Sequence, residues 1–289
     1  MTLAVDTSYW YLFICPLSMN LMFALITCKM MDDRSLVKRD GYKDYMDKTN
    51  QLLIFPKKRL WYFKNEFLRS ILENKIKLWG AGTTRTLRPI WMAEELGIDY
   101  ALMPIGPRTG ETQSKEYTDL NPKQKIPFLE NGEIKLSESL AICRYLQYTF
   151  PSDKIFIPKN NIDKAKEDEW CSYIYGEIDE TALYVMRRHY DLKSIYGDSP
   201  IVVKACREHL DKHLAIIDNF IKNKKSILDK GFGLADIMLI SCLDWAIYYE
   251  FKLPDNIMSY RENIKKRPAF KKAMLANYKS TEVANNGTT

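Results

Sequence analysis

The chain of 289 residues has few of the features that mark several protein classes. Glycine and proline are sparse, with 12 of each, and there is no internal repeat or low-complexity tract, which argues against fibrous, solenoid and disordered classes. The six cysteines form no C-x-x-C motif and no close pair. In a chain of this length, scattered cysteines predict reduced thiols on apolar helix faces of a cytoplasmic protein. They are Cys15, Cys28, Cys143, Cys171, Cys206 and Cys242.

The main body of the chain also lacks a basic footprint. The net charge is +6, and residues 29–77 alone hold 13 basic and 7 acidic side chains, so the chain beyond residue 77 is close to neutral. Nucleic-acid binding needs clustered Lys and Arg, so we expect no nucleic-acid partner. The hydrophobic fraction of 46% and the charged fraction of 28% are typical of a globular protein of one or two domains.

Metal ligands are scarce as well. Of the three histidines, His209 and His213 are four residues apart, which places both on one face of a helix. Structural and catalytic zinc sites need at least a third protein ligand, and the nearby sequence suggests none. We therefore expect no metal site and interpret the pair as surface histidines of a helix.

One long apolar stretch, at residues 9–28, has roughly the length that spans a bilayer. Basic residues follow it at positions 29–39, which would keep the rest of the chain on the cytoplasmic side. Proline, serine and asparagine in its middle argue against a span. Two hypotheses remain for the N-terminal extension 1–75: a membrane anchor with membrane contact through residues 9–28, or an apolar extension that packs elsewhere. Residues 57–74 can form a basic amphipathic helix.

The pattern changes at residue 75, where short strands and helices begin to alternate. The predicted elements are strand 76–79, helix 83–96, strand 99–105, helix 114–120, strands 127–130 and 133–136, and helix 137–150. Gly97 is placed to cap the first helix, and Asn131-Gly132 is a strong hairpin signal. A parallel βαβ unit closed by an antiparallel hairpin predicts an α/β thioredoxin-like domain over residues 76–150.

A linker with two prolines, at residues 151–162, precedes an all-α C-terminal domain that we predict over residues 163–280. Its expected helices are 163–190, 200–222 and 234–250, with shorter helices from residues 259 and 268. Aromatic residues, a methionine and an arginine line the first of these helices, and we assign this stripe to the core because that is its commoner role. The stripe consists of Tyr173, Tyr175, Tyr184, Met186 and Arg187.

Several motifs resemble those of the cytosolic glutathione transferases. N-P-x-x-K-I-P-x-L-E occupies residues 121–130, and G-x-x-x-L-x-E-S-x-x-I-x-x-Y-L occupies residues 132–146. Arg88, the E-E-L-G sequence at 94–97 and the R-P-A-F sequence at 267–270 also fit that family. The resemblance is to the serine/threonine type of the bacterial, zeta and theta branches. It implies glutathione as co-substrate, a hydrophobic electrophilic small molecule as second substrate, and a homodimer.

The resemblance also implies a glutathione site. Ile126 would present its backbone to the peptide part of glutathione, and its bond to Pro127 is a candidate cis peptide, with an ordinary trans turn as the alternative. Ser139 would donate to the γ-glutamyl carboxylate at a helix N-terminus, and Glu138 would pair with the α-amino group. A plain capping motif is the alternative at these two residues. Lys125 is an expected contact of the glycyl end.

The catalytic position falls at the start of helix 83–96. The reactive form of glutathione is the thiolate, and a hydroxyl at a helix N-terminus stabilises it by a charge-assisted hydrogen bond and the helix dipole. The resemblance places Thr83 or Thr84 there, with Thr83 preferred and Arg85 as a further contact; helix capping alone is the alternative. Threonine departs from the family's commoner serine or tyrosine. No cysteine occupies the position, which argues against thiol–disulfide exchange.

Gly233 marks another departure from the family. The resemblance assigns it to a buried capping box, in which serine or threonine is usual and Asp236 supplies the other half. We expect a helix start that is weakened by the missing hydroxyl and a fold that stays intact.

These features together predict a glutathione S-transferase that conjugates the glutathione thiolate to hydrophobic electrophiles. One alternative shares the thiolate: a glutathione-dependent isomerase, peroxidase or reductive dehalogenase. The other alternative keeps the fold without turnover, as a glutathione-transferase-like binding or scaffold module.

Overall fold

The computed structural model describes residue 35 and residues 76–285. The chain divides into two compact units, Met1–Glu73 and Asn74–Thr289. The proposed anchor at residues 9–28 and the amphipathic helix at 57–74 lie outside the described residues and stay predictions. Among the helices that the structure describes, none is both long and apolar enough to cross a membrane.

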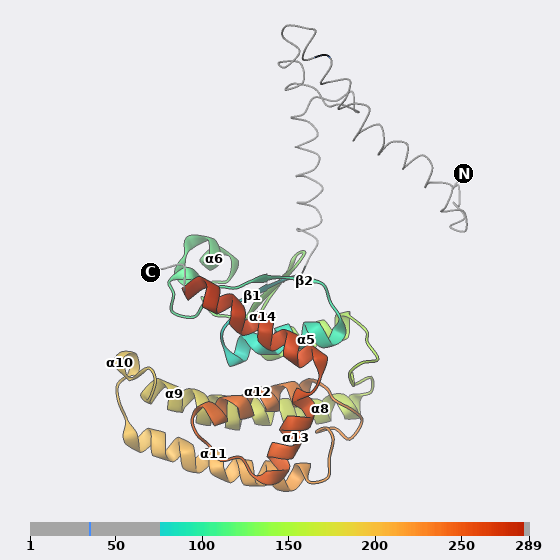
Figure 1. Cartoon of the computed structure of the whole chain (residues 1–289), viewed down its shortest axis with the longest axis vertical. Helices are drawn as coiled ribbons and strands as arrows, with labels where there is room; N and C mark the ends of the chain where they lie inside the picture. Colours follow the sequence, from blue (N-terminus) through green and yellow to red (C-terminus); the bar gives the residue numbers. More distant parts are fainter. Residues whose placement is uncertain (1–34, 36–75, 286–289) are drawn as a thin grey trace, which may run out of the picture. The chain divides into compact units, whose positions relative to one another are not determined.

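The first half of the second unit is a four-stranded mixed sheet with helices (Figure 1). Its elements are β1 (Ile76–Trp79), α5 (Thr84–Leu96), β2 (Tyr100–Met103), η3 (Glu111–Gln113), α6 (Lys115–Leu120), β3 (Phe128–Asn131), β4 (Ile134–Ser137) and α7 (Ser139–Thr149). The strand order is β2-β1-β3-β4, with β1 parallel to β2 and antiparallel to β3. The predicted thioredoxin-like arrangement is confirmed, and β2 is shorter than expected because β1 offers it only four pairing residues.

Local sequence accounts for both ends of α5. The Thr83 side chain accepts the backbone N–H of Thr86 at 3.0 Å and caps the N-terminus. Gly97 closes the C-terminus with a left-handed φ of 72°, which glycine adopts without steric penalty. The helix thus lies within one residue of the predicted range, and its N-terminus is placed directly after the glycine-containing turn.

The second half is all-helical, as predicted. Its elements are α8 (Asn161–Tyr173), η4 (Ile174–Tyr184), α9 (Val185–His189), α10 (Lys193–Tyr196), α11 (Pro200–Ile221), α12 (Leu234–Tyr248), α13 (Asp255–Lys265) and α14 (Pro268–Asn285). The expected single helix over 163–190 is interrupted by η4, a π-helical segment. Nearly every side chain of α12 is buried, because its sequence is apolar all round.

The two halves share one core. Helix α14 packs along α5, and α12 contacts both α5 and η4 (Figure 1). The ring of Trp91 lies 5.5 Å from that of Phe232 and 4.8 Å from that of Phe270, between centroids. Arg267 donates two hydrogen bonds of 2.7 Å to Glu95. The boundary that we place between residues 150 and 163 therefore remains a proposed division within a single compact unit.

Asp236 caps α12 although Gly233 carries no hydroxyl. Its carboxylate accepts the N–H groups of Gly233 and Ile227, each at 2.8 Å, and the Tyr260 hydroxyl. A Cβ on Gly233 would come within 3.0 Å of the Phe156 carbonyl oxygen. A side chain at position 233 would press on the Phe156 backbone, and the hydrogen bonds from Ile227 and Tyr260 hold the Asp236 carboxylate in place.

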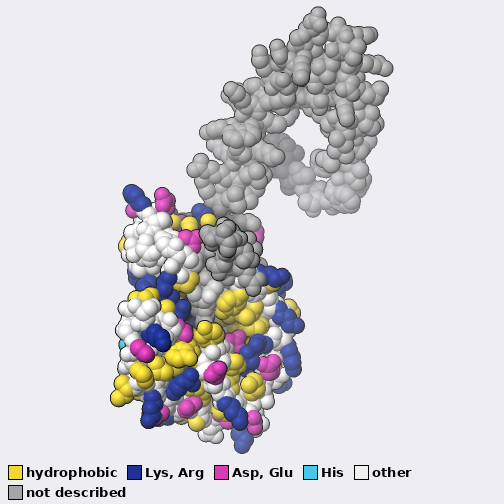
Figure 2. Space-filling model, turned by 60° about the vertical axis from the view of Figure 1, so that its left-hand side comes forward, with side chains coloured by type: hydrophobic (Ala, Val, Ile, Leu, Met, Phe, Trp, Pro, Cys, Tyr) yellow, Lys and Arg dark blue, Asp and Glu magenta, His cyan; other side chains and the backbone are white. Residues whose placement is uncertain are grey.

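The cysteines and the surface charges of the described residues agree with the predictions from the sequence. Cys143, Cys171, Cys206 and Cys242 are free and buried, as predicted, whereas Cys15 and Cys28 lie outside the described residues. On the face shown in Figure 2, basic and acidic side chains are interspersed with hydrophobic ones.

Candidate functional site

A pocket of about 880 Å³ lies between the thioredoxin-like half and the helical half. The thioredoxin-like half contributes Gly82, Thr83, Thr84, Arg85, Lys125 and Ile126. The helical half contributes Tyr184, Arg187, Trp245, Tyr248, Met274 and Tyr278. The start of α5 forms a polar wall, while the opposite wall combines aromatic side chains with charged ones such as Asp244 and Lys265; its aromatic part is called the aromatic wall. Such a pocket suits a polar peptide next to an apolar second molecule.

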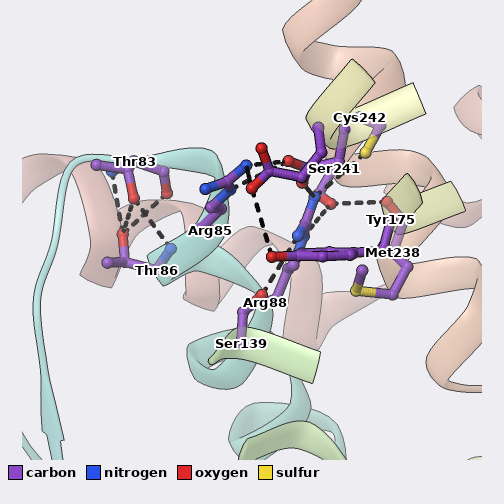
Figure 3. Close-up of polar contacts among 11 residues, drawn as sticks. Thr83, Arg85, Thr86, Arg88, Ser139, Tyr175, Met238, Ser241 and Cys242 are labelled. Atoms are coloured by element: carbon purple, nitrogen blue, oxygen red, sulfur yellow. Dashed lines mark hydrogen bonds and ion pairs between the residues drawn. The ribbon is translucent and has the colours of Figure 1, made fainter. Parts of the chain in front are cut away.

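The two threonines at the start of α5 are half-buried and have different partners. Thr83 Oγ1 accepts the Thr86 N–H and lies 3.0 Å from Thr86 Oγ1 (Figure 3). The Thr84 side chain lies beside the Tyr278 hydroxyl, a phenol whose pKa is raised by burial. A hydroxyl carries one hydrogen and two lone pairs, so the cap at Thr83 uses a lone pair and its hydrogen can turn to a ligand. Capping and ligand binding at Thr83 are therefore compatible.

Asn277 of α14 holds this turn in place. Its Oδ1 accepts the Thr86 hydroxyl at 2.7 Å and the Gly82 N–H at 3.2 Å, and its Nδ2 donates to the Thr83 carbonyl at 3.0 Å. The residue is fully buried. Sequence reasoning missed it, because one asparagine in a long helix gives no signal of a contact with the far end of the fold.

Two arginines of α5 converge on Asp179 of η4. The Arg85 Nε donates to Oδ1 at 3.1 Å, while Arg88 donates to Oδ2 (Figure 3). Desolvation by burial would raise the pKa of Asp179, but attraction by Arg88 and Arg85 outweighs it and holds the pKa below its ordinary value. Arg85, predicted as a glutathione contact, is thus engaged by the helical half, and 23% of its side chain stays exposed at the pocket.

Arg88 also connects this ion pair to the start of α7. Its Nη1 donates to Ser139 Oγ at 3.3 Å, and its Nε donates to Ser241 Oγ at 2.7 Å. Ser139 is 4% exposed. Because the Ser139 oxygen accepts from Arg88, its own hydrogen is left to donate to a carboxylate. Arg88 is therefore placed to orient the hydroxyl that was predicted to bind the γ-glutamyl end.

Glu138, directly before Ser139, has an unusual backbone. Its φ is 74°, a left-handed value that is uncommon outside glycine and often marks functional sites. Its side chain is exposed and pairs with Lys123 at 3.2 Å. Glu138 and Ser139 stand together at the start of α7 but do not line the pocket.

The loop before β3 brings Lys125 and Ile126 to the pocket. The peptide bond between Ile126 and Pro127 is cis, as predicted. Tyr117 and Asn121 both donate to the Lys125 carbonyl, at 2.7 and 2.8 Å. Pro127 itself is buried away from the pocket lining. The hydrogen bonds to the Lys125 carbonyl therefore fix the loop, and Ile126 lines the same pocket as the start of α5.

The assignment of the aromatic stripe to the core was wrong for two of its members. Tyr184 and Arg187 line the pocket, and the Arg85 guanidinium lies 4.4 Å from the centroid of the Tyr184 ring. The prediction rested on the commoner role of such a stripe and did not include the π-helical segment η4, whose i→i+5 hydrogen bonds change which side chains share a face.

The fold and the pocket define a two-part thioredoxin-fold protein with a binding site at the junction of its halves. Residues 74–148 match the family model described as the glutathione S-transferase, N-terminal domain. The thioredoxin-like half of the chain is thus similar to the N-terminal domain of the glutathione S-transferases.

Curated relatives and solved structures agree with this similarity. The chain is 27% identical to glutathione S-transferase GstA of Escherichia coli O157:H7 over 63% of its own length and 89% of that protein. It is 25% identical to human glutathione S-transferase theta-1, over 52% of its length and only 63% of that protein. A glutathione transferase from Phanerochaete chrysosporium, URE2P6, solved with oxidized glutathione, superposes with a TM-score of 0.63 at 19% identity, covering 71% of this chain and 97% of that one.

Proposed function

We propose that this chain is a glutathione transferase that conjugates the thiol of its co-substrate glutathione to hydrophobic electrophiles. Structures with glutathione or oxidized glutathione bound are among its neighbours in fold. One observation supports the proposal above the others: the hydroxyls of Thr83 and Thr84 face an aromatic wall across one pocket, at the N-terminus of a 13-residue helix. The glutathione thiol and the electrophile would therefore bind next to each other in this pocket.

The start of α5 supplies the means to form the thiolate. A free thiol has a pKa near 8.5 and is mostly protonated at neutral pH. The first turn of α5 contains no acidic residue that would offset the positive end of the helix dipole. We place the sulfur against Thr83 or Thr84, where a hydroxyl donor and the dipole both favour the anion. The thiol proton passes to solvent and the thiolate attacks the electrophilic carbon. A carbon–sulfur bond forms as the bond from that carbon to its leaving group, chloride in a chlorinated dinitrobenzene, breaks.

The rest of glutathione extends along the sheet half in this proposal. The backbone of Ile126 pairs with its peptide groups, next to Pro127. Ser139, oriented by Arg88, donates to the γ-glutamyl carboxylate, and Glu138 meets the α-amino group. Lys125, whose side chain is exposed, attracts the glycyl carboxylate. Each of these contacts places a charged or polar end of the tripeptide against a group of opposite character.

The aromatic wall is the proposed place of the electrophile. Trp245, Tyr184 and Met274 offer apolar surface, and the Tyr278 hydroxyl lies next to Thr84. Because burial raises the pKa of Tyr278, its phenol stays protonated at neutral pH and can donate a hydrogen bond to the electrophile. We further propose that the protein acts as a cytoplasmic homodimer in detoxification, as the family resemblance implies.

Turnover by the full-length chain tests the proposal. We expect conjugation of glutathione to a chlorinated dinitrobenzene, and about a 10²-fold loss of kcat/KM when the catalytic threonine becomes alanine, the effect of removing one donor to a developing anion. Thr83→Ala and Thr84→Ala identify that residue, and Thr83→Ser and Thr84→Ser are the matched controls that keep a hydroxyl. Glutathione binding by the wild type without any conjugation would favour the scaffold or another thiol chemistry. No glutathione binding at all would refute the site.

A further inference from the structure

Three metal-binding side chains converge between η4 and α11, away from the pocket. Glu177 Oε2 lies 3.1 Å from His209 Nε2 and 3.7 Å from His213 Nε2. All three ligand atoms lie within 4.8 Å of one another. The third ligand could not be predicted from the sequence, because Glu177 is remote from the two histidines along the chain. The prediction that both histidines are surface residues was wrong for His213, which is buried.

One of these nitrogens is buried beside a carboxylate without forming a hydrogen bond. His209 Nε2 makes no hydrogen bond with any residue that the structure describes, although Glu177 Oε2 is 3.1 Å away. Buried polar atoms in folded proteins are normally paired, because an unpaired one forfeits its interactions with water. A cation between the carboxylate and the imidazole would satisfy both groups at once.

His213 is already oriented as a metal ligand. Its Nδ1 lies 2.7 Å from the Tyr173 hydroxyl, which leaves Nε2 directed at Glu177. Ligating histidines are commonly fixed in this way, by a hydrogen bond at the ring nitrogen that does not touch the metal. The imidazole rings of His209 and His213 also pack against each other, with centroids 4.4 Å apart.

We propose that Glu177, His209 and His213 bind one Zn²⁺ ion, with a fourth position open to water. Two imidazoles and one carboxylate are an established ligand set for zinc. In a tetrahedral site with bonds of about 2.0 Å, ligand atoms are about 3.3 Å apart. The observed separations of 3.1 and 3.7 Å from Glu177 are close to that value, and the ligand atoms of the two histidines, within 4.8 Å of each other, would approach on binding.

The position of the site gives it a structural role that is independent of the proposed conjugation. The ion links η4 to α11, and Asp179, which holds Arg85 and Arg88, lies two residues from Glu177 on the same π-helical segment. Zinc binding therefore stabilises the segment that supports the pocket while the ligands themselves lie outside the pocket lining.

Calorimetric titration of the chelator-stripped full chain with Zn²⁺ tests the proposal. We expect one equivalent bound by the wild type, about a 100-fold weaker affinity in His209→Gln and in His213→Ala, and about a 10-fold weaker affinity in Glu177→Gln. His189→Gln is the matched control, because this third histidine bonds the Gly197 carbonyl at 3.0 Å and lies outside the cluster. Its affinity should equal that of the wild type.

Thermal unfolding gives a second readout. Zn²⁺ at about 100 times its dissociation constant should raise the midpoint by about 5 to 10 °C in the wild type and in His189→Gln, and leave it unchanged in His209→Gln. Since His213 is buried and its replacement can disturb folding, the half-exposed positions His209 and Glu177 decide the result. Wild-type affinity in His209→Gln, or no zinc binding by the wild type, overturns the proposal.

Discussion

At the scale of single residues, the chemistry of the pocket depends on where one hydroxyl hydrogen points. The Thr86 hydroxyl donates to Asn277 and accepts the backbone N–H of Thr83 at 3.0 Å. This leaves Thr83 Oγ1 with a lone pair committed to the helix cap and a hydrogen that turns between Thr86 and the pocket. The threonine pair 83 and 86 thus combines a structural cap with a donor for the ligand.

Replacement of Asn277 should affect both stability and rate. Asn277→Ala removes three hydrogen bonds from the turn before α5, so we expect the free energy of unfolding to fall by about 2 to 3 kcal/mol. Because Thr83 then loses its support, kcat should fall more than KM for glutathione changes. Chemical denaturation and steady-state kinetics measure the two effects. Lys272→Ala, at an exposed position of the same helix, should leave both unchanged.

Removal of the Tyr278 hydroxyl should lower the rate of conjugation. Tyr278→Phe keeps the ring and removes the hydroxyl that meets Thr84. If this phenol donates to the electrophile, kcat/KM should fall by about 10-fold at an unchanged glutathione affinity. Equal kinetics in Tyr278→Phe and the wild type would exclude that role.

At the scale of elements, η4 connects the helical half to the start of α5. Removing one partner of a buried ion pair leaves the other charge unsatisfied. Arg88→Met should therefore lower the free energy of unfolding by about 3 kcal/mol, although Arg85 still contacts Asp179. A double-mutant cycle with Asp179→Asn measures the coupling, and purely additive effects would contradict a direct interaction.

The cap of α12 makes the stability of the folded state depend on pH, in a direction that follows from the pKa of Asp236. Desolvation raises the pKa of Asp236 to about 6, against hydrogen bonds from Tyr260, Ile227 and Gly233 that act in the opposite direction. The folded state then binds a proton more tightly than the unfolded state. The contribution of Asp236 to stability is fully present below its unfolded pKa of about 3.8, falls as the pH rises, and is lost above about 6.

Chemical denaturation across this pH range measures whether the contribution of Asp236 to stability falls as the pH rises. The stability of the wild type relative to Asp236→Asn should decline by up to about 3 kcal/mol between pH 4 and pH 6 and then stay constant. The difference between the two proteins isolates Asp236 from the opposite contribution of Asp179, whose pKa is lowered. A difference that grows with pH would contradict the raised value.

The elements also show what sequence can and cannot predict. Helix α5 lies within one residue of its expected range because Thr83 and Gly97 carry local capping signals. The π-helical η4 was missed, since i→i+5 bonding leaves no periodic signature in composition. The motif residues Thr83, Thr84 and Ile126 do meet in one pocket. Tyr278 lines the pocket, and Asn277 supports the turn of Thr83 from behind it, only through the long-range packing of α14 on α5.

At the scale of the whole molecule, the two halves of residues 76–285 are joined by buried apolar contacts and by charged pairs. Trp91 packs on Phe232 and Phe270, and Glu95 binds Arg267. We therefore expect the sheet and the helical half to unfold together, with coincident midpoints by tryptophan fluorescence and by circular dichroism. Two separated transitions within this unit would contradict a shared core.

The central claim is that the start of α5 turns bound glutathione into a thiolate. The most direct measurement is the ultraviolet absorbance of the thiolate as a function of pH, with glutathione bound to the full-length wild type and to the alanine variants of Thr83 and Thr84. The account predicts a bound thiol pKa at least about one unit below the free value of about 8.5, and a return toward that value in one of the two variants. A bound pKa equal to that of free glutathione in the wild type would contradict it.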